Sequence, residues 1–270
     1  MVLRALAVGN AVVHTSGEFH TPSLDDFFPP VFAFEGTPFA MNRVMVIRLV
    51  MLAIMVILLL VYARRARLVP GRAQATMELL FDFVRTSISE QAMGKTMAAK
   101  YNGVVAVVFF TALFMNFAGI IPGLNLAGTS VAGLPILMAI VAWVAFIWAG
   151  IREQGVGGFF KSALFPPGVP KPIYLILTPI EALSTFIIRP FTLFVRLMAN
   201  MISGHFMLAL CLAGTNFLLL YMQGPLRAVG ILTFLGAIFV TLFEMVVAFL
   251  QAYIFGILTA VYIDLSVHSH

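Results

Sequence analysis

The sequence predicts an all-α polytopic membrane protein with about five transmembrane helices and one amphipathic helix on the membrane surface. Of its 270 residues, 61% are hydrophobic and only 10% are charged, whereas a soluble domain carries about 25% charged residues. Several apolar runs approach the ~20 residues that a helix needs to cross the hydrocarbon core. A lipid-embedded segment must satisfy its own backbone polar groups, and the ~10-residue alternating segments of a membrane barrel are absent from the sequence.

Five apolar runs account for the predicted crossings. They are residues 44–63, 103–121, 133–150, 173–213 and 225–265. The last two runs are each about 40 residues long, which corresponds to ~60 Å of helix and to twice the hydrocarbon thickness. We therefore expect both helices to tilt strongly, to bend or to lie against another protein. Pro225 suits the first turn of the last helix.

Two segments between the crossings have a different character. In residues 71–100, apolar Met77, Leu80, Phe81 and Val84 recur at helical spacing among charged residues. This pattern predicts a helix on the cytoplasmic membrane surface, although a soluble amphipathic connector would show the same pattern. The prolines and glycines of residues 155–172 predict an irregular loop.

The distribution of charge predicts the orientation in the cell membrane. Basic residues gather in the segments 64–100 and 152–171, whereas the first 42 residues hold one arginine against four acids. Basic loops stay in the cytoplasm. We therefore expect residues 1–42 to form an external N-terminal segment, residues 43–270 to form a single multi-pass membrane domain, and the C-terminus to be cytoplasmic.

Several other classes of protein are disfavoured. The net charge of +5 is spread over two loops rather than one patch, so we expect no nucleic-acid partner. A single cysteine, Cys211, excludes a disulfide within the chain and disfavours a zinc site. The chain lacks the G-x-x-x-x-G-K-[ST] phosphate loop. We expect no bound nucleotide, cofactor or metal, and no catalysis by this chain itself.

The last two predicted helices hold nearly all the polar groups within the membrane. These are Glu181, Arg189, Arg196, Asn200, Ser203 and His205 on one helix, and Glu244, Gln251 and Asp264 on the other. A charge at mid-bilayer costs at least ~2.5–3.5 kcal/mol on insertion scales, so such groups face protein or water and mark an ion path by default.

A helical wheel gathers most of these groups on one face. With Arg196 at zero and ~100° per residue, Arg189 lies near +20°, Asn200 near +40°, and Ser203 near −20°. Glu181 falls near −60°, still on this face, whereas His205 lies on the opposite side. On the last helix, Glu244 and Gln251 share a face with Tyr262.

Depth in the membrane separates the same groups into clusters. If Gln251 is level with Arg196 on the antiparallel helix, His205 lies ~13 Å and Glu244 ~10 Å toward the outside. These two side chains should therefore be neighbours. Glu181 and Asp264 lie ~20 Å toward the cytoplasm. The pattern is a polar cluster on each side with a permanent cation between them.

The paired motifs resemble subunit a of the bacterial F-type rotary ATP synthase. The resemblance rests on "RPFTLFVRLMANMISGH" and "FEMVVAFLQAYIFGILTAVYI", and more weakly on "GEFHTP", "IIPG" and "LTPIEALS". It implies that Arg196 is the stator arginine facing the ring of c subunits. It also implies an outer proton half-channel with His205 and Glu244, an inner one with Glu181, and Asn200 and Gln251 near the ring carboxylate.

The resemblance also implies partners, and this sequence departs from the family's pattern at two places. Partners would be the c-ring, b-type subunits of the peripheral stalk, and lipid. Many members place an acid where His205 stands and a histidine where Glu244 stands, so this chain exchanges the two. The loop after Pro122 often carries an aspartate, and here it carries Asn125 and no acid.

Two alternatives to the motor subunit remain open at this point. A self-contained secondary transporter or channel would hold its own ion-binding acid near the level of Arg196. This chain has no acid between Glu181 and Glu244, which favours a carboxylate supplied by a partner. A non-conducting scaffold would leave the buried charges unexplained.

Overall fold

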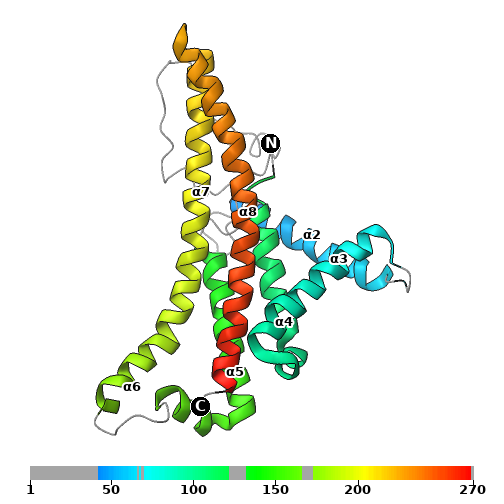
Figure 1. The fold of residues 1–270 in the computed structure, drawn as a ribbon, viewed down its shortest axis with the longest axis vertical. Coiled ribbons are helices and arrows are strands. Elements are labelled where there is room, and N and C mark those ends of the chain that lie inside the picture. Colours follow the sequence, from blue (N-terminus) through cyan, green and yellow to red (C-terminus); the bar gives the residue numbers. More distant parts are fainter. Residues whose placement is uncertain (1–41, 66, 68–69, 122–131, 166–172, 269–270) are drawn as a thin grey trace. The chain divides into compact units, whose positions relative to one another are not determined.

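The computed structural model describes residues 42–65, 67, 70–121, 132–165 and 173–268, and these residues form helices and short connections without a β-strand (Figure 1). Five of the helical stretches are long and apolar enough to cross a membrane. The predicted all-α polytopic class is confirmed. All but the last residue of the predicted external segment, 1–42, lies outside the described residues, as does the Asn125 loop.

The helices follow the predicted order along the chain. They are α2 (Arg43–Arg65), α3 (Arg72–Phe83), the π-helix η2 (Val84–Glu90), α4 (Gln91–Phe117), α5 (Gly133–Leu164), α6 (Tyr174–Leu183), the π-helix η4 (Ser184–Ile188), α7 (Arg189–Leu220) and α8 (Pro225–Val267). The last two candidate spans cover 47 and 43 residues, so both are as long as the apolar runs indicate. Pro225 begins α8, where its missing N–H costs nothing.

Two glycines interrupt the helices, one inside the segment 71–100 and one shortly after the predicted crossing 133–150. Gly94 has φ 72° and Gly155 has φ 77°, a left-handed conformation that glycine adopts without a steric penalty. The helical stretch that begins at Arg72 is thus broken at Gly94, six residues before the end expected for the surface helix. The expectation of an irregular loop from 155 is wrong for residues 156–164, which are helical. The helix changes direction at Gly155 alone. It can continue to Leu164 because no proline occurs before Pro166.

The described residues pack into two compact units. Unit 2 comprises Ala53–Phe114, Ala132–Met198 and Phe249–His270. Its core contains the fully buried Phe109, Phe146, Phe159 and Phe255. Gln154, beside the break in α5, donates from Nε2 to the carbonyl oxygens of Ser266 and Val267, both at 2.9 Å. This amide satisfies carbonyls that the end of α8 would otherwise leave without partners.

Unit 1 comprises Met1–Leu52, Met115–Val131 and Ala199–Ala248. Within it, the second half of α7 runs antiparallel along the first half of α8 (Figure 1). The hydroxyls of Thr215 and Thr233 lie 3.0 Å apart across this hairpin. A Cβ on Gly230 would lie 2.8 Å from Leu219 Cδ2. Small residues therefore let the two helices approach closely, as is typical of helix pairs in membranes.

Candidate functional site

A polar stripe runs along the exposed surface of α7. Thr192, Arg196, Asn200 and Ser203 are all exposed in the chain, and they recur at intervals of three or four residues. The intervening Leu193 and Leu197 are buried. The helix thus turns its apolar side toward the rest of the chain and presents a permanently charged guanidinium outward.

His205 and Glu244 meet inside unit 1. His205 Nδ1 lies 3.8 Å from Glu244 Oε1, and the side chains are only 7% and 10% exposed. Their depth on two antiparallel helices predicts this neighbourhood, and the structure confirms it. At 3.8 Å the carboxyl group and the imidazole are neighbours that lie just beyond hydrogen-bond length.

Gly204 makes room for this pair. A Cβ added to Gly204 would lie 2.7 Å from Glu244 Oε1 and 3.3 Å from its Cδ. The carboxyl group of α8 therefore rests directly against the backbone of α7. Any side chain at this position would displace Glu244 away from its present place beside His205.

Gln251 is buried rather than exposed, with 2% of its surface accessible. The same hydrophobic core in unit 2 contains Leu193 and Leu197 of α7 and Ala252 and Phe255 of α8. These residues flank Arg196 and Gln251 in the sequence, which agrees with placing the two polar residues at one level. That Gln251 lies near a ring carboxylate stays a prediction.

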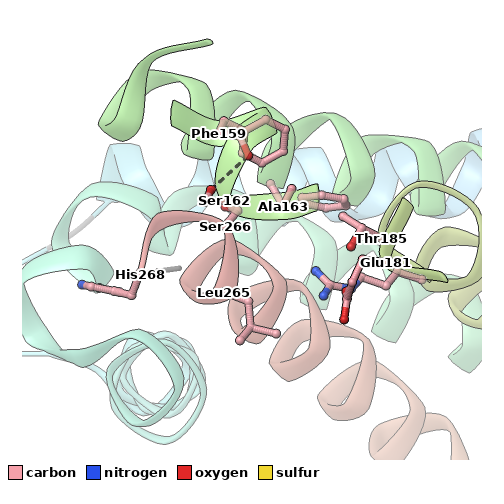
Figure 2. A pocket seen from close by; sticks show the side chains of 10 residues that line it. Phe159, Ser162, Ala163, Glu181, Thr185, Leu265, Ser266 and His268 are labelled. Carbon is pink, nitrogen blue, oxygen red and sulfur yellow. Dashed lines mark hydrogen bonds between the residues drawn. The ribbon is translucent and has the colours of Figure 1, made fainter. Parts of the chain in front are cut away.

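A cavity of about 340 Å³ opens in unit 2 among α5, the α6–η4–α7 stretch and the end of α8 (Figure 2). Its polar lining is provided by Ser162, Glu181, Thr185, Arg189, Ser266 and His268. A volume of this size holds several water molecules. Glu181 and Thr185 point into the same region in Figure 2, so the cavity joins an acid to hydroxyl groups and to water.

The π-helix η4 sets the direction of Glu181. Eight residues separate Glu181 from Arg189, which would turn them ~80° apart on a regular α-helix. The π-helical turn at Ser184–Ile188 accommodates an extra residue. Both side chains consequently line one cavity. The guanidinium of Arg189 also lies over the ring of Tyr262, 5.3 Å from its centroid.

The end of α8 contributes residues that the sequence analysis did not single out. His268 lines the cavity, and its Nδ1 lies 2.8 Å from Asp264 Oδ1. Asp264 pairs with this histidine and is not among the cavity-lining residues. Ser162 donates its hydroxyl to the carbonyl of Phe159 at 3.0 Å (dashed line in Figure 2). The i, i+4 spacing of Asp264 and His268 is the sequence signal for their pairing.

The comparisons with known proteins agree with these features. A family model described as the ATP synthase A chain matches residues 44–264. The chain belongs to the ATP synthase subunit a family. It is therefore a multi-pass membrane protein, and the resemblance seen in the sequence is confirmed, together with its class of function, subunit a of the membrane sector of an ATP synthase.

Relatives from several bacteria extend over most of the chain. A protein of Rhodococcus erythropolis named ATP synthase subunit a is 43% identical over 253 residues, covering 93% of this chain and 92% of the relative. One from Frankia alni is 42% identical over 201 residues, or 74% and 68% of the two chains. One from Pseudarthrobacter chlorophenolicus is 32% identical over 254 residues, or 94% and 95%. The Frankia and Pseudarthrobacter proteins are also named ATP synthase subunit a.

Proposed function

We propose that this chain is the non-catalytic stator of a rotary motor, which couples proton translocation to ATP synthesis through two half-channels and an essential arginine. The observation that carries the proposal is the exposed stripe of α7, with Arg196 between Thr192 and Asn200. An exposed charge in an apolar helix requires a polar or charged partner. In the 174–220 span, only 11% of the apolar window is buried within the chain, which leaves its surface for a ring of c subunits.

The proposed mechanism assigns a role to each polar group. Arg196 cannot lose its proton, so it would hold each passing ring carboxylate ionised and would block direct proton flow between the half-channels. His205 and Glu244 would pass protons in the outer half-channel. Glu181, which lines the cavity, would carry protons in the inner half-channel. Asn200 and Ser203 would supply hydrogen bonds along the ring-facing stripe.

The remaining partners follow from this assignment. The ring carboxylate would come from the c subunits, b-type subunits of the peripheral stalk would hold the chain still, and lipid would cover the apolar surfaces. The membrane potential would drive rotation with ~2.3 kcal/mol per charge per 100 mV. A self-contained transporter is the weaker proposal because no acid occurs between Glu181 and Glu244 in the sequence.

Replacement of Arg196 tests the stator proposal most directly. We expect Arg196→Ala to abolish ATP-driven proton pumping in membrane vesicles while the complex still assembles. Arg196→Lys should also fail, because a compact ammonium lacks the planar fork of the guanidinium. Arg227→Ala, which removes an exposed arginine near the start of α8, is the matched control and should pump normally. Near-normal pumping by Arg196→Ala would refute the proposal.

The proposed orientation has its own test. We propose that the N-terminus is external, and that the segment containing Arg72 and Lys95 lies at the cytoplasmic surface. In a Cys211→Ser background, Arg72→Cys and Lys95→Cys should react with a membrane-impermeant thiol reagent only from the cytoplasmic side. Labelling of either position in intact cells would contradict the proposed orientation.

A further inference from the structure

Four arginines lie together where α2 ends and α3 begins. Arg64, Arg65, Arg67 and Arg72 are all exposed. No aspartate or glutamate occurs between Glu35 and Glu78 in the sequence. Within the described part of the chain, none of the four arginines makes an ion pair. This surface, which we call the arginine cluster, therefore carries four positive charges that nothing described in this chain neutralises.

A side-chain clamp holds the backbone of the arginine cluster. The carboxamide of Gln74 accepts a hydrogen bond from the N–H of Arg67 at 3.1 Å and donates one to its carbonyl oxygen at 2.9 Å. Its nitrogen also lies 2.7 Å from Glu78 Oε1. The backbone of Arg67 is thereby fixed against the first turns of α3. Fixing the backbone lowers the entropy lost when a ligand is bound.

The cluster also continues an apolar surface. Ile57, Leu58, Leu60 and Val61 of α2 are exposed large hydrophobic residues, and they immediately precede Arg64. The ring of Tyr62 stacks on Phe81 of α3 with centroids 5.4 Å apart. The end of α2 is therefore packed on α3, and the surface changes from hydrocarbon-compatible to strongly basic at a defined level.

We propose that the arginine cluster binds the phosphate headgroup of an anionic phospholipid. Such a lipid offers both features that this surface matches: acyl chains beside the exposed apolar residues of α2, and a phosphodiester at the level of the arginines. Guanidinium groups bind phosphate oxygens through two parallel hydrogen bonds. Basic residues at a membrane surface attract anionic lipids strongly enough to change local lipid occupancy about fivefold for each residue.

Photocrosslinking in the assembled complex tests the proposal. The complete ATP synthase carrying this chain is placed in nanodiscs of phosphatidylcholine that contain a trace of photoreactive phosphatidylglycerol or, in parallel, of photoreactive phosphatidylcholine. After irradiation, mass spectrometry quantifies the lipid attached to the peptide spanning residues 62–78. We expect phosphatidylglycerol to be attached in clear preference, and the preference to fall as salt is raised.

Three variants sharpen this experiment. Replacing Arg64, Arg65 and Arg67 together by glutamine should lower the preference about fivefold for each charge removed. Gln74→Leu keeps all four charges but loses the clamp, so it should lower the preference to a smaller extent. Arg85→Gln, which neutralises an exposed arginine paired with Glu90 at 3.1 Å, should leave it unchanged.

Three results would overturn the proposal. They are equal attachment of the two lipids to the unmodified chain, an unchanged preference in the triple variant, and a wild-type preference in Gln74→Leu, which would reduce the cluster to unorganised charge. A fourth result would also overturn it: attachment of neither lipid to this peptide, which would indicate that a protein partner covers the surface. None of these readouts depends on proton transport, so the stator proposal is tested separately.

Discussion

In unit 1 the ionisable side chains of His205 on α7 and Glu244 on α8 lie side by side, whereas in unit 2 ionisable side chains from α6, α7 and the end of the α8 segment line a cavity. His205 and Glu244 lie 3.8 Å apart and are almost fully enclosed. Glu181, Arg189 and His268 surround about 340 Å³ of space. In the first arrangement two enclosed groups face each other just beyond hydrogen-bond length, whereas in the second the groups border open space.

The difference has local causes. In unit 1, Gly204 and Gly230 bring the helices close enough to exclude other groups. In unit 2, the π-helical turn η4 turns Glu181 and Arg189 toward one cavity. The break at Gly155 gives the end of α5 a new direction, and Phe159 and Ser162 beyond it form part of the wall. The polar groups of the two units thus have different surroundings, one closely packed and the other around a cavity.

The largest effects should come from exchanging the two members of the touching pair. His205→Glu alone would place two acids together, and Glu244→His alone would place two imidazoles together. Each should strongly reduce ATP-driven proton pumping. The double variant restores one acid and one base at this level and should pump better than either single variant, a non-additivity expected of neighbours. If the double variant pumps no better than the worse single one, the pair has no joint role.

A smaller effect is expected from the glycine beside this pair. The added methyl group of Gly204→Ala would lie 2.7 Å from Glu244 Oε1, so the flexible carboxyl group would have to move from its place beside His205. We expect pumping to fall about tenfold. Gly214→Ala is the matched control on the same helix, because a Cβ there meets nothing within 4 Å. Equal pumping by the two variants, in complexes that assemble equally, would show that close approach at Gly204 does not matter.

The cavity should tolerate change better than the pair, because water can rearrange within it. Ala163 lines the cavity, and Ala163→Phe would fill much of its volume. We expect a partial, roughly two- to fivefold loss of pumping, since the space holds several waters and need not be blocked completely. Ala163→Ser keeps the space and should pump normally. Unaltered pumping by the phenylalanine variant would argue against a water path through this cavity.

The fold class and the order of the helices could be predicted from the sequence because a segment in lipid must satisfy its own backbone hydrogen bonds. A long apolar run must be a helix, so the class and the order of the spans follow from composition alone. The touching pair could also be predicted, since helix rise converts residue number into depth. The prediction that His205 and Glu244 are neighbours required only the assumption that their two helices are antiparallel.

Other features depend on packing that no local pattern encodes. The helix after Gly155, the burial of Gln251 and the position of Asp264 outside the cavity that Glu181 lines all depend on tertiary contacts.

By itself, the sequence determined the membrane class, the five apolar spans, the subunit a motifs and the neighbourhood of His205 and Glu244. Only the tertiary structure decided that Arg196 faces outward while Gln251 faces inward, that Glu181 shares a cavity with Arg189, and that Gly204 seats the carboxyl group of Glu244. The physical reason is that periodicity assumes regular α-helices. A π turn, a left-handed glycine or a missing Cβ changes the direction of a side chain or the distance between helices, and such departures are stabilised by the packing around them.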